Sequence, residues 1–334
     1  MKLIVCGNHN PYFFNTVECR EKALRELGHE VLFFDTRDYR LPGVMRQSCV
    51  WCQRWDVARN SRNLVELARR EKPDICLVVG GNVAPEAVRE LSSLGARTSL
   101  WTTDPPHDFK EVIRSAPAYD RVFCSGTEAM DILEAKAALQ APAVWLPFAC
   151  DHGLHCPAEL DSTDRLRYAR DVAFVGSYYP NRAEMLEPLA EFEPGIWGPY
   201  WNRVGKRSPL RPFIHDQRVA HDEWRKIYTA AQVVVVVHYQ DGITPCCQAS
   251  PKLFESLACG AFVLCDEQRD AQSLFRDGEQ VVYFRDAEDL YAKVQHYLAH
   301  PDERARIAAA GRQETLERHS WRVRMQQFLD EAAQ

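Results

Sequence analysis

The stretch from residue 250 to residue 264 reads Ser250-Pro251-Lys252-Leu253-Phe254-Glu255-Ser256-Leu257-Ala258-Cys259-Gly260-Ala261-Phe262-Val263-Leu264. Ser250 is a favourable N-cap, Pro251 suits the first helical position and Gly260 suits a helix end, so a helix followed by a buried strand is expected. The start of such a helix presents unpaired N–H groups and a positive dipole end, with Lys252 in its first turn. A diphosphate would fit there, with Glu255 accepting hydrogen bonds from a ribose diol. A capped helix with solvated charges is the alternative.

The alternation of strand and helix extends along the whole chain. Short apolar strands are predicted at 3–6, 31–34, 74–79, 97–101, 121–124, 143–146, 172–175, 233–237, 262–265 and 281–284. Strands that are apolar throughout and separated by helices indicate parallel sheets covered on both sides. We therefore expect two doubly wound α/β domains in tandem. The expected divisions are a first domain at 1–150, a linker at 151–170, a second domain at 171–318 and a final helix at 319–334.

Composition and charge exclude several classes of protein. The 334 residues include 41 basic and 47 acidic side chains, a net charge of −6, which argues against a protein that is basic throughout. Hydrophobic residues at 46% and charged residues at 26% are globular values, so a disordered or fibrous chain is excluded. The apolar run 233–237 is far shorter than the roughly 20 residues of a membrane-spanning helix, so no membrane insertion is expected. Twelve cysteines without a framework spacing favour reduced thiols and a cytoplasmic location.

Residues that directly follow strands attract attention, because ligands of open α/β sheets bind beyond the carboxyl ends of the strands. The residues selected in this way include Asn8, His9, Gly81, Asp104, Gly176, Ser177 and His238. Two such domains facing each other would form a cleft, which is a favoured place for a substrate.

Several segments resemble GT-B glycosyltransferases. Residues 250–264 resemble the donor-binding helix of that family, with its Pro, Glu, Ser and Ala-Cys-Gly in order. The segment 171–182 resembles the glycine loop that opens the second domain, and Ile196-Trp197-Gly198 resembles the strand and glycine near the nucleotide base. Residues 277–321 resemble the C-terminal tail of the family. Residues 101–105, Trp-Thr-Thr-Asp-Pro, are similar to a segment of the CgeB-like, spore-maturation-type branch, within the broader family 1-4-like glycosyltransferases.

The resemblance implies two Rossmann-like domains facing across a cleft, with the C-terminal helix crossing back to the first domain. It also implies transfer of a sugar from a nucleotide-diphosphate sugar, expected to be a UDP-sugar, to an acceptor hydroxyl on a glycan, protein, small molecule or modified DNA. The donor-binding candidates are Gly176, Ser177, Arg182, Gly198, His238, Ser250, Lys252 and Glu255. Acceptor-side candidates are Asn8, Gly81, Trp51 and Trp55.

No cofactor beyond the donor is expected. The sequence has no Asp-x-Asp motif, which argues against the metal-dependent glycosyltransferase fold. The helix start and Arg182 or Lys252 are instead expected to neutralise the leaving diphosphate. The chain departs from the family at Cys247, where many retaining enzymes have a second Glu, and at Lys252, where the CgeB-like branch often has Arg. The stereochemistry of transfer therefore stays open, and a nucleotide-sugar epimerase or a non-catalytic nucleotide-sugar-binding protein is an alternative function.

A base is expected to activate the acceptor hydroxyl. Asp104 is the leading candidate because it follows a strand and precedes two prolines, and His9 and His107 are the other candidates. A turn aspartate that bonds its own backbone is the structural alternative for Asp104.

Two segments are locally basic. Residues 37–72 contain nine Lys and Arg against four Asp and Glu, with Trp51 and Trp55 among them, and residues 203–226 contain seven against three. A solvated helix and a donor-binding loop explain them, while a nucleic-acid surface would make hydroxymethylated DNA bases the acceptor. Cys49 and Cys52, with Cys150 and Cys156, have the residue types of a zinc site but not the spacing of one, so no metal is expected.

Overall fold

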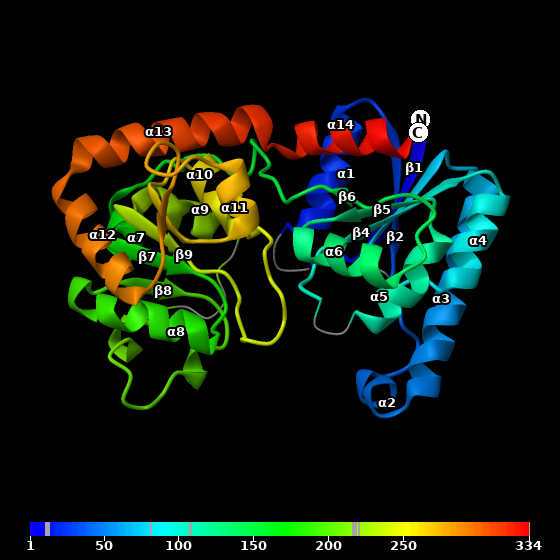
Figure 1. The fold of residues 1–334 in the computed structure, drawn as a ribbon, viewed down its shortest axis with the longest axis horizontal. Coiled ribbons are helices and arrows are strands. Elements are labelled where there is room, and N and C mark those ends of the chain that lie inside the picture. The colour runs from blue at the N-terminus through cyan, green and yellow to red at the C-terminus, as the bar shows by residue number, and fades with distance from the viewer. Residues whose placement is uncertain (11–13, 81, 107–108, 216–218, 220, 334) are drawn as a thin grey trace. The chain divides into compact units, whose positions relative to one another are not determined.

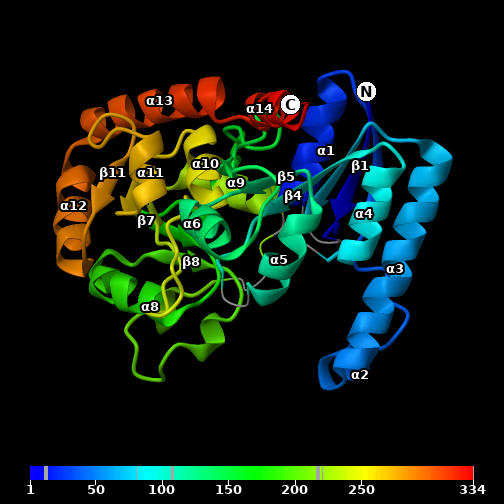
Figure 2. The same cartoon turned by 45° about the vertical axis from the view of Figure 1, so that its right-hand side comes forward.

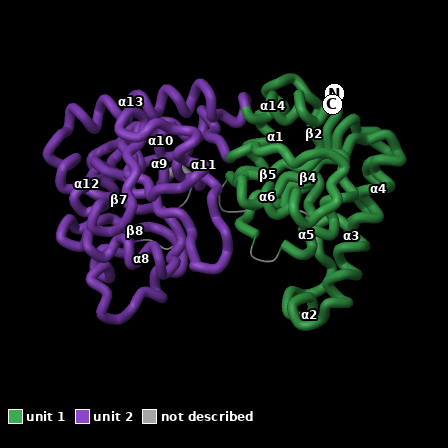
Figure 3. Tube along the Cα trace, viewed as in Figure 1, with its two compact units in different colours: residues 1–147, 324–334 green, residues 148–323 purple. Residues whose placement is uncertain are grey.

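The computed structural model describes residues 1–10, 14–80, 82–106, 109–215, 219 and 221–333. It divides into two compact units (Figure 3). Unit 1 comprises Met1–Pro147 and Arg324–Gln334, and unit 2 comprises Phe148–Val323. Each unit has one parallel sheet flanked by helices (Figures 1 and 2), so the predicted α/β class is confirmed.

The sheet of unit 1 has the strand order β2-β1-β3-β4-β5-β6, and every described pairing in it is parallel. Its strands are β1 (Lys2–Gly7), β2 (Glu30–Asp35), β3 (Ile75–Val79), β4 (Arg97–Thr102), β5 (Arg121–Cys124) and β6 (Val144–Trp145). Leu3 lies opposite Val31 on one side and Ile75 on the other, and all three side chains are buried. This register places the carboxyl ends of β1, β3 and β4 at one edge of the sheet.

The helices of unit 1 connect these strands and cover the sheet. They are α1 (Thr16–Glu26), α2 (Gly43–Ser48), α3 (Val50–Glu71), α4 (Pro85–Ser93), α5 (Lys110–Ser115), α6 (Thr127–Lys136) and a short 3₁₀ turn at Ala116–Ala118. Helix α14 (Trp321–Ala332) supplies the last piece of the unit: the Phe328 ring lies 5.0 Å from the Phe123 ring, and Arg97 donates to the Ala332 carbonyl. Helix α2 and the start of α3 project from the body of unit 1 (Figures 1 and 2).

The sheet of unit 2 has the order β11-β10-β9-β7-β8 and is parallel as well. Its strands are β7 (Val172–Val175), β8 (Gly195–Trp197), β9 (Val233–Val236), β10 (Val263–Asp266) and β11 (Val282–Phe284). Its helices are α7 (Ser162–Tyr168), α8 (Pro180–Leu186), α9 (His221–Ala230), α10 (Pro251–Ala258), α11 (Arg269–Leu274), α12 (Ala287–Ala299), α13 (Pro301–Arg318) and 3₁₀ turns at Glu187–Phe192, Trp201–Arg203 and Arg211–Phe213. The run 233–237 is fully buried at the centre of the sheet, as its uniform apolarity predicts.

The polar segment 151–170, expected to be a linker, belongs to unit 2. Asp161 caps α7 by accepting from the Asp164 N–H, and the Tyr168 hydroxyl donates to Glu223 of α9. The Lys226 ammonium also binds Asp164 at 3.0 Å. The sequence suggested a linker because the segment is polar. Its polar side chains pair instead with a neighbouring helix, and sequence composition does not reveal such pairing.

Candidate active site

The first feature at the carboxyl end of the unit 2 sheet is a tight loop after β7. Gly198, at φ +139°, lies so close to this loop that an added Cβ would stand 2.1 Å from the Gly176 carbonyl oxygen. The same oxygen accepts from the Trp201 indole N–H at 2.8 Å, and the Gly176 N–H donates to the Trp197 carbonyl. Only glycine fits position 198, because both its φ and the close approach exclude a side chain. The Gly176-Ser177 backbone is thus held rigidly.

A buried hydrogen-bond network joins the ends of β9 and β10 to the start of α10. The His238 Nδ1 lies 2.5 Å from Asp266 Oδ1, and the backbone N–H of His238 donates to the same carboxylate. The His238 Nε2 accepts from the Ser250 N–H at 2.9 Å, so the ring proton resides on Nδ1 and points to Asp266. Both ring nitrogens are therefore engaged. His238 thus positions the N-cap of α10, and its predicted role in binding the donor stays a prediction.

Arg182 is a buried cation without a carboxylate partner among the described residues. Its Nε donates to the Val237 carbonyl and one terminal nitrogen donates to the Ser177 carbonyl, both at 2.9 Å. Burial lowers the pKa of Arg182, because desolvation disfavours the charged form. A buried charge that lacks an ionic partner is costly unless an anion joins it. This residue is thus a strong candidate to contact a bound anion.

Lys252 and Glu255 lie one turn apart at the start of α10, and both are half-buried. Ser250 caps the helix by accepting from the Lys252 N–H at 3.4 Å. Neither the Lys252 ammonium nor the Glu255 carboxylate has a hydrogen bond or ion pair within the described ranges. The pKa of Lys252 is lowered by its burial, with the nearby charge of Arg182 acting in the same direction and Glu255 opposing both. Two neighbouring cations and a helix N-terminus together favour a doubly charged anion.

Asn181 is a further candidate that sequence reasoning did not select. Its Nδ2 donates to the His238 carbonyl at 2.9 Å, while its buried Oδ1 has no partner in the described structure. A buried polar atom without a hydrogen bond is uncommon in native proteins. Asn181 follows Pro180 at the first turn of α8, next to the glycine loop, which is the only sequence signal that could have indicated it.

In unit 1, His9 and Glu21 form a pair beyond the end of β1. The His9 Nε2 lies 2.5 Å from Glu21 Oε1, and its ring stacks on Phe33 with the ring centroids 3.6 Å apart. The Glu21 carboxylate is buried and also pairs with Arg25. A neutral imidazole that donates its Nε2 proton to Glu21 leaves Nδ1 as an acceptor. Because His9 itself is exposed, this arrangement suits a general base.

The other acceptor-side candidates of unit 1 are less constrained. Asp104 is exposed after β4 and has no hydrogen bond or ion pair with any described residue. The Asn8 carbonyl accepts from the Asn15 side chain, which caps α1. Gly81 and His107 lie outside the described residues. The geometry thus favours His9 over Asp104 as the base.

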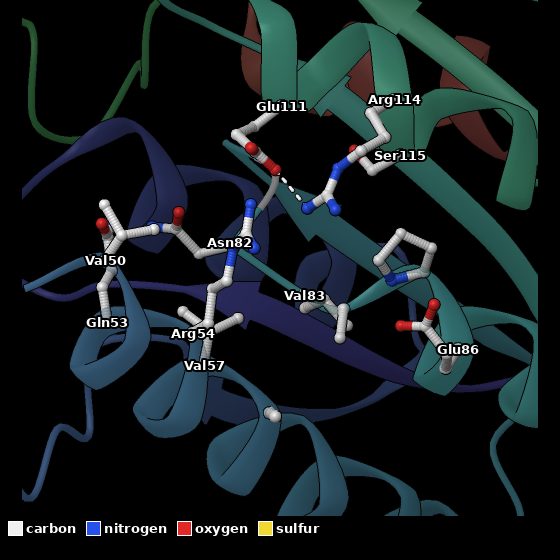
Figure 4. Close-up of a pocket in the computed structure, with 13 residues that line it drawn as sticks. Val50, Gln53, Arg54, Val57, Asn82, Val83, Glu86, Glu111, Arg114 and Ser115 are labelled. Carbon is white, nitrogen blue, oxygen red and sulfur yellow. Dashed lines mark hydrogen bonds and ion pairs between the residues drawn. The ribbon is translucent and has the colours of Figure 1, made fainter.

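A pocket lined by both polar and apolar side chains opens at the carboxyl edge of the unit 1 sheet (Figure 4). It is formed by α3, the loop after β3, the start of α4, and α5. Arg54 and the ion-paired Arg114 and Glu111 point into it from α3 and α5 respectively, and Asn82 contributes an amide. Trp51 and Trp55 do not line this pocket; both are exposed and line a separate apolar groove on α3.

The four cysteines at which the sequence predicts no zinc site lie in different units. Cys49 and Cys52 belong to unit 1, whereas Cys150 and Cys156 belong to unit 2, and all four are free thiols. Among the described residues, one group of three possible metal ligands lies close together, namely His238, Cys265 and Asp266. The ring nitrogens of His238 are already hydrogen-bonded, so this group is part of the network that holds α10.

Comparisons with known proteins bear on the whole chain. Residues 182–330 match the family model described as Glycosyl transferase-like, and no curated protein sequence matches. Sucrose-phosphate synthase from Thermosynechococcus elongatus is similar at 13% identity with a TM-score of 0.72, over 100% of this chain and 98% of that one. HepE from Anabaena, solved with UDP-glucose, is similar at 11% identity with a TM-score of 0.67, over 99% of each chain.

A third similar structure is an α-glucosyltransferase in complex with UDP-glucose and DNA containing an abasic site. It shares 10% identity with a TM-score of 0.65, over 100% of this chain and 99% of that one. None of the helices in the described part of the chain combines the length and apolarity needed to cross a membrane. The structural similarities and the family match confirm the expected fold and the expected type of enzyme domain. The chain therefore has the GT-B fold, and its residues 182–330 match a glycosyl transferase-like family model.

Proposed function

We propose that the chain transfers a sugar from a UDP-sugar to an acceptor hydroxyl without an obligatory divalent metal. The observation that supports this most directly is the pair of cations Arg182 and Lys252 beside the start of α10, neither of which has an ion pair with a described residue. A diphosphate leaving group develops negative charge as the sugar–phosphate bond breaks. The two cations and the N–H groups of α10 stabilise that charge, and HepE, a protein of similar fold, is known with UDP-glucose bound.

The remaining roles follow from the positions of the side chains. Glu255, one turn into α10, accepts hydrogen bonds from the ribose diol, and the free Oδ1 of Asn181 accepts one from a donor hydroxyl. On unit 1, His9 takes the proton of the acceptor hydroxyl at Nδ1, and Glu21 stabilises the imidazolium that forms. The Asp-Pro segment at Asp104 supports membership of the CgeB-like branch, and the buried free thiols favour a cytoplasmic location.

A panel of labelled nucleotide sugars, with and without acceptors, tests the reaction. Transfer or slow hydrolysis of a UDP-sugar supports a transferase. Interconversion of two UDP-sugars without an acceptor identifies an epimerase. Binding of a UDP-sugar without any reaction identifies a non-catalytic binding protein. Glu255→Ala is expected to raise the dissociation constant of UDP at least tenfold, while Glu288→Ala, which removes an exposed carboxylate on α12, leaves it unchanged. Equal UDP affinities in the two variants would remove Glu255 from the donor site.

The two variants His9→Asn and Asp104→Asn test which residue is the general base. We expect His9→Asn to reduce the rate of transfer about 100- to 10,000-fold with UDP affinity unchanged, since general base catalysis contributes in that range. Asp104→Asn is expected to retain most of its activity. The reverse result would assign the base to Asp104.

Modified DNA is a second candidate acceptor. Trp51 and Trp55 are exposed on α3 beside Arg54, a combination that suits stacked bases and phosphates. One protein of similar fold is known in complex with DNA. Transfer to hydroxymethylated DNA that falls steeply with added salt would support this acceptor.

A further inference from the structure

The exposed apolar side chains of unit 1 are concentrated on α2 and the first two turns of α3. Val44, Trp51, Val50, Trp55 and Met45 are 78%, 77%, 59%, 51% and 47% exposed, and α2 has no buried residue at all. Soluble monomers rarely expose several large apolar side chains together without a partner. The rest of α3 packs on unit 1 with one side, where Asp56, Asn60 and Leu64 are buried. We call residues 41–55 the α2–α3 tip.

The tip is held in a definite conformation, so its exposure is not that of a loose chain end. The buried carboxylate of Asp56 accepts from the backbone N–H groups of Arg40 and Leu41 at 2.9 and 3.0 Å. The Arg46 guanidinium donates to the Leu41 carbonyl and lies 3.7 Å above the Tyr39 ring. These contacts fix the segment that precedes α2, and the apolar side chains of the tip are exposed.

The charge around the tip has one sign. From Arg37 to Trp55 the sequence contains four arginines and one acidic residue, Asp38, which pairs with Arg59. Of these four arginines, Arg46 pairs with the buried Asp56, while Arg37, Arg40 and Arg54 have no ion pair among the described residues. An exposed apolar surface beside such arginines is complementary to a partner that is both apolar and anionic.

A shallow apolar groove lies on the tip. It is lined by Leu41, Trp51, Cys52 and Trp55, with Arg54 as its one charged member. Arg54 also lines a neighbouring pocket of mixed polar and apolar character, which contains the charged Glu111 and Arg114 (Figure 4). Arg54 thus stands between an apolar groove and a pocket with charged groups, an order that matches an amphiphile whose anionic group lies between a hydrocarbon chain and a polar head.

We propose that the α2–α3 tip docks on an anionic lipid surface, with Trp51 and Trp55 entering the interface and Arg54 binding a lipid phosphate. A nucleic acid would use the arginines and the indoles but would leave Val44, Met45 and Val50 exposed, and these are three of the five exposed apolar side chains of the tip. Tryptophan and arginine beside aliphatic residues are typical of side chains at a membrane interface. Docking of this kind goes beyond the proposed transfer reaction and does not depend on it.

Vesicle binding of the full chain, without any nucleotide sugar, tests the proposal. We expect binding to vesicles of phosphatidylcholine and phosphatidylglycerol in equal parts, weaker binding to phosphatidylcholine alone, and loss of binding as salt is raised. Brominated acyl chains are expected to quench tryptophan fluorescence. Trp51→Ser/Trp55→Ser should lower the partition coefficient at least tenfold, and Arg54→Gln about fivefold, since a basic residue contributes about 1 kcal/mol near an anionic surface.

Matched controls separate docking from general effects. Leu166→Ser removes an apolar side chain that is 83% exposed on α7 of unit 2, and Arg70→Gln removes an exposed charge at the other end of α3. Both controls should bind vesicles like the wild type, and all four variants should keep its melting temperature because the side chains are exposed. Absence of binding to the mixed vesicles, or equal binding by the Trp double variant, overturns the proposal. Binding of a single-stranded oligonucleotide that is lost in the same variants, without vesicle binding, would assign the tip to nucleic acid.

Discussion

The proposed donor side of unit 2 and the proposed acceptor side of unit 1 are built in different ways on similar parallel sheets. In unit 2, His238, Asp266 and Arg182 are buried and bonded to backbone groups that directly follow β7 and β9 and to the N-cap of α10. In unit 1, His9, Asp104 and Arg54 are exposed, and only His9 has a side-chain hydrogen bond among the described residues. The proposed donor site is therefore rigid, whereas the proposed acceptor surface depends on side chains that the fold does not constrain.

The largest expected effect concerns the buried network of unit 2. His238→Ala leaves the Asp266 carboxylate and the Ser250 N–H without their ring partners, so the free energy of unfolding should fall by about 2–4 kcal/mol. His296→Ala removes a comparable but exposed pair with Glu303 and should cost less than about 0.5 kcal/mol. Chemical denaturation measures both. Equal losses in the two variants would contradict the contrast between a buried and an exposed pair.

The next prediction separates binding from stability at Arg182. Arg182→Met keeps the length of the side chain but removes the charge, so UDP affinity should fall about 10- to 100-fold. The melting temperature should change little, because relief of a buried charge offsets the loss of two hydrogen bonds to carbonyls. Calorimetric titration and thermal unfolding are the measurements. A large loss of stability with unchanged UDP affinity would make Arg182 a structural residue.

Lys252 allows a test by pH. Its pKa lies below the ordinary value of 10.5 because the side chain is buried and Arg182 is near. The ammonium therefore loses its proton at a lower pH than an ordinary lysine, and UDP affinity should decline before the pH reaches 10.5. Lys252→Arg keeps the charge at all accessible pH values and should abolish that decline. Parallel declines in the two proteins would place the titrating group elsewhere.

The smallest effect is expected in unit 1, at Asp56. Burial would raise the pKa of this carboxyl, but N–H donation from Arg40 and Leu41 and the nearby Arg46 and Arg59 leave it below its ordinary value of 3.8. A lowered pKa in the folded state means that the stabilisation is present above pH 3.8 and is lost as the pH falls through the lowered value.

Asp56→Asn should therefore lower the free energy of unfolding by about 1–2 kcal/mol at neutral pH, with a smaller difference in acid. Limited proteolysis should show earlier cleavage near residues 37–48 in the variant. A variant as resistant as the wild type at neutral pH would show that other contacts hold the tip.

Much of the fold could be predicted from local patterns. The strands at 121–124 and 172–175 have the predicted boundaries, because apolar runs with clear end signals define them. The final helix, predicted at 319–334, spans Trp321–Ala332. Helix α7 escaped prediction. Its polar residues pair with α9, so the segment lacks the apolar stripe by which a packed helix is recognised in a sequence.

The sequence by itself determined the start of α10, because Ser250, Pro251 and Lys252 set the cap, the first turn and the charge through contacts within a few residues. Only the tertiary structure decided how that start is held. His238 and Asp266 are 28 positions apart, and Arg182 reaches a carbonyl 55 positions away. Such partners meet because β7, β9 and β10 are neighbours in the sheet, and strand order is a property of the whole unit. The pairing of His9 with Glu21 likewise required the packing of α1 against the sheet.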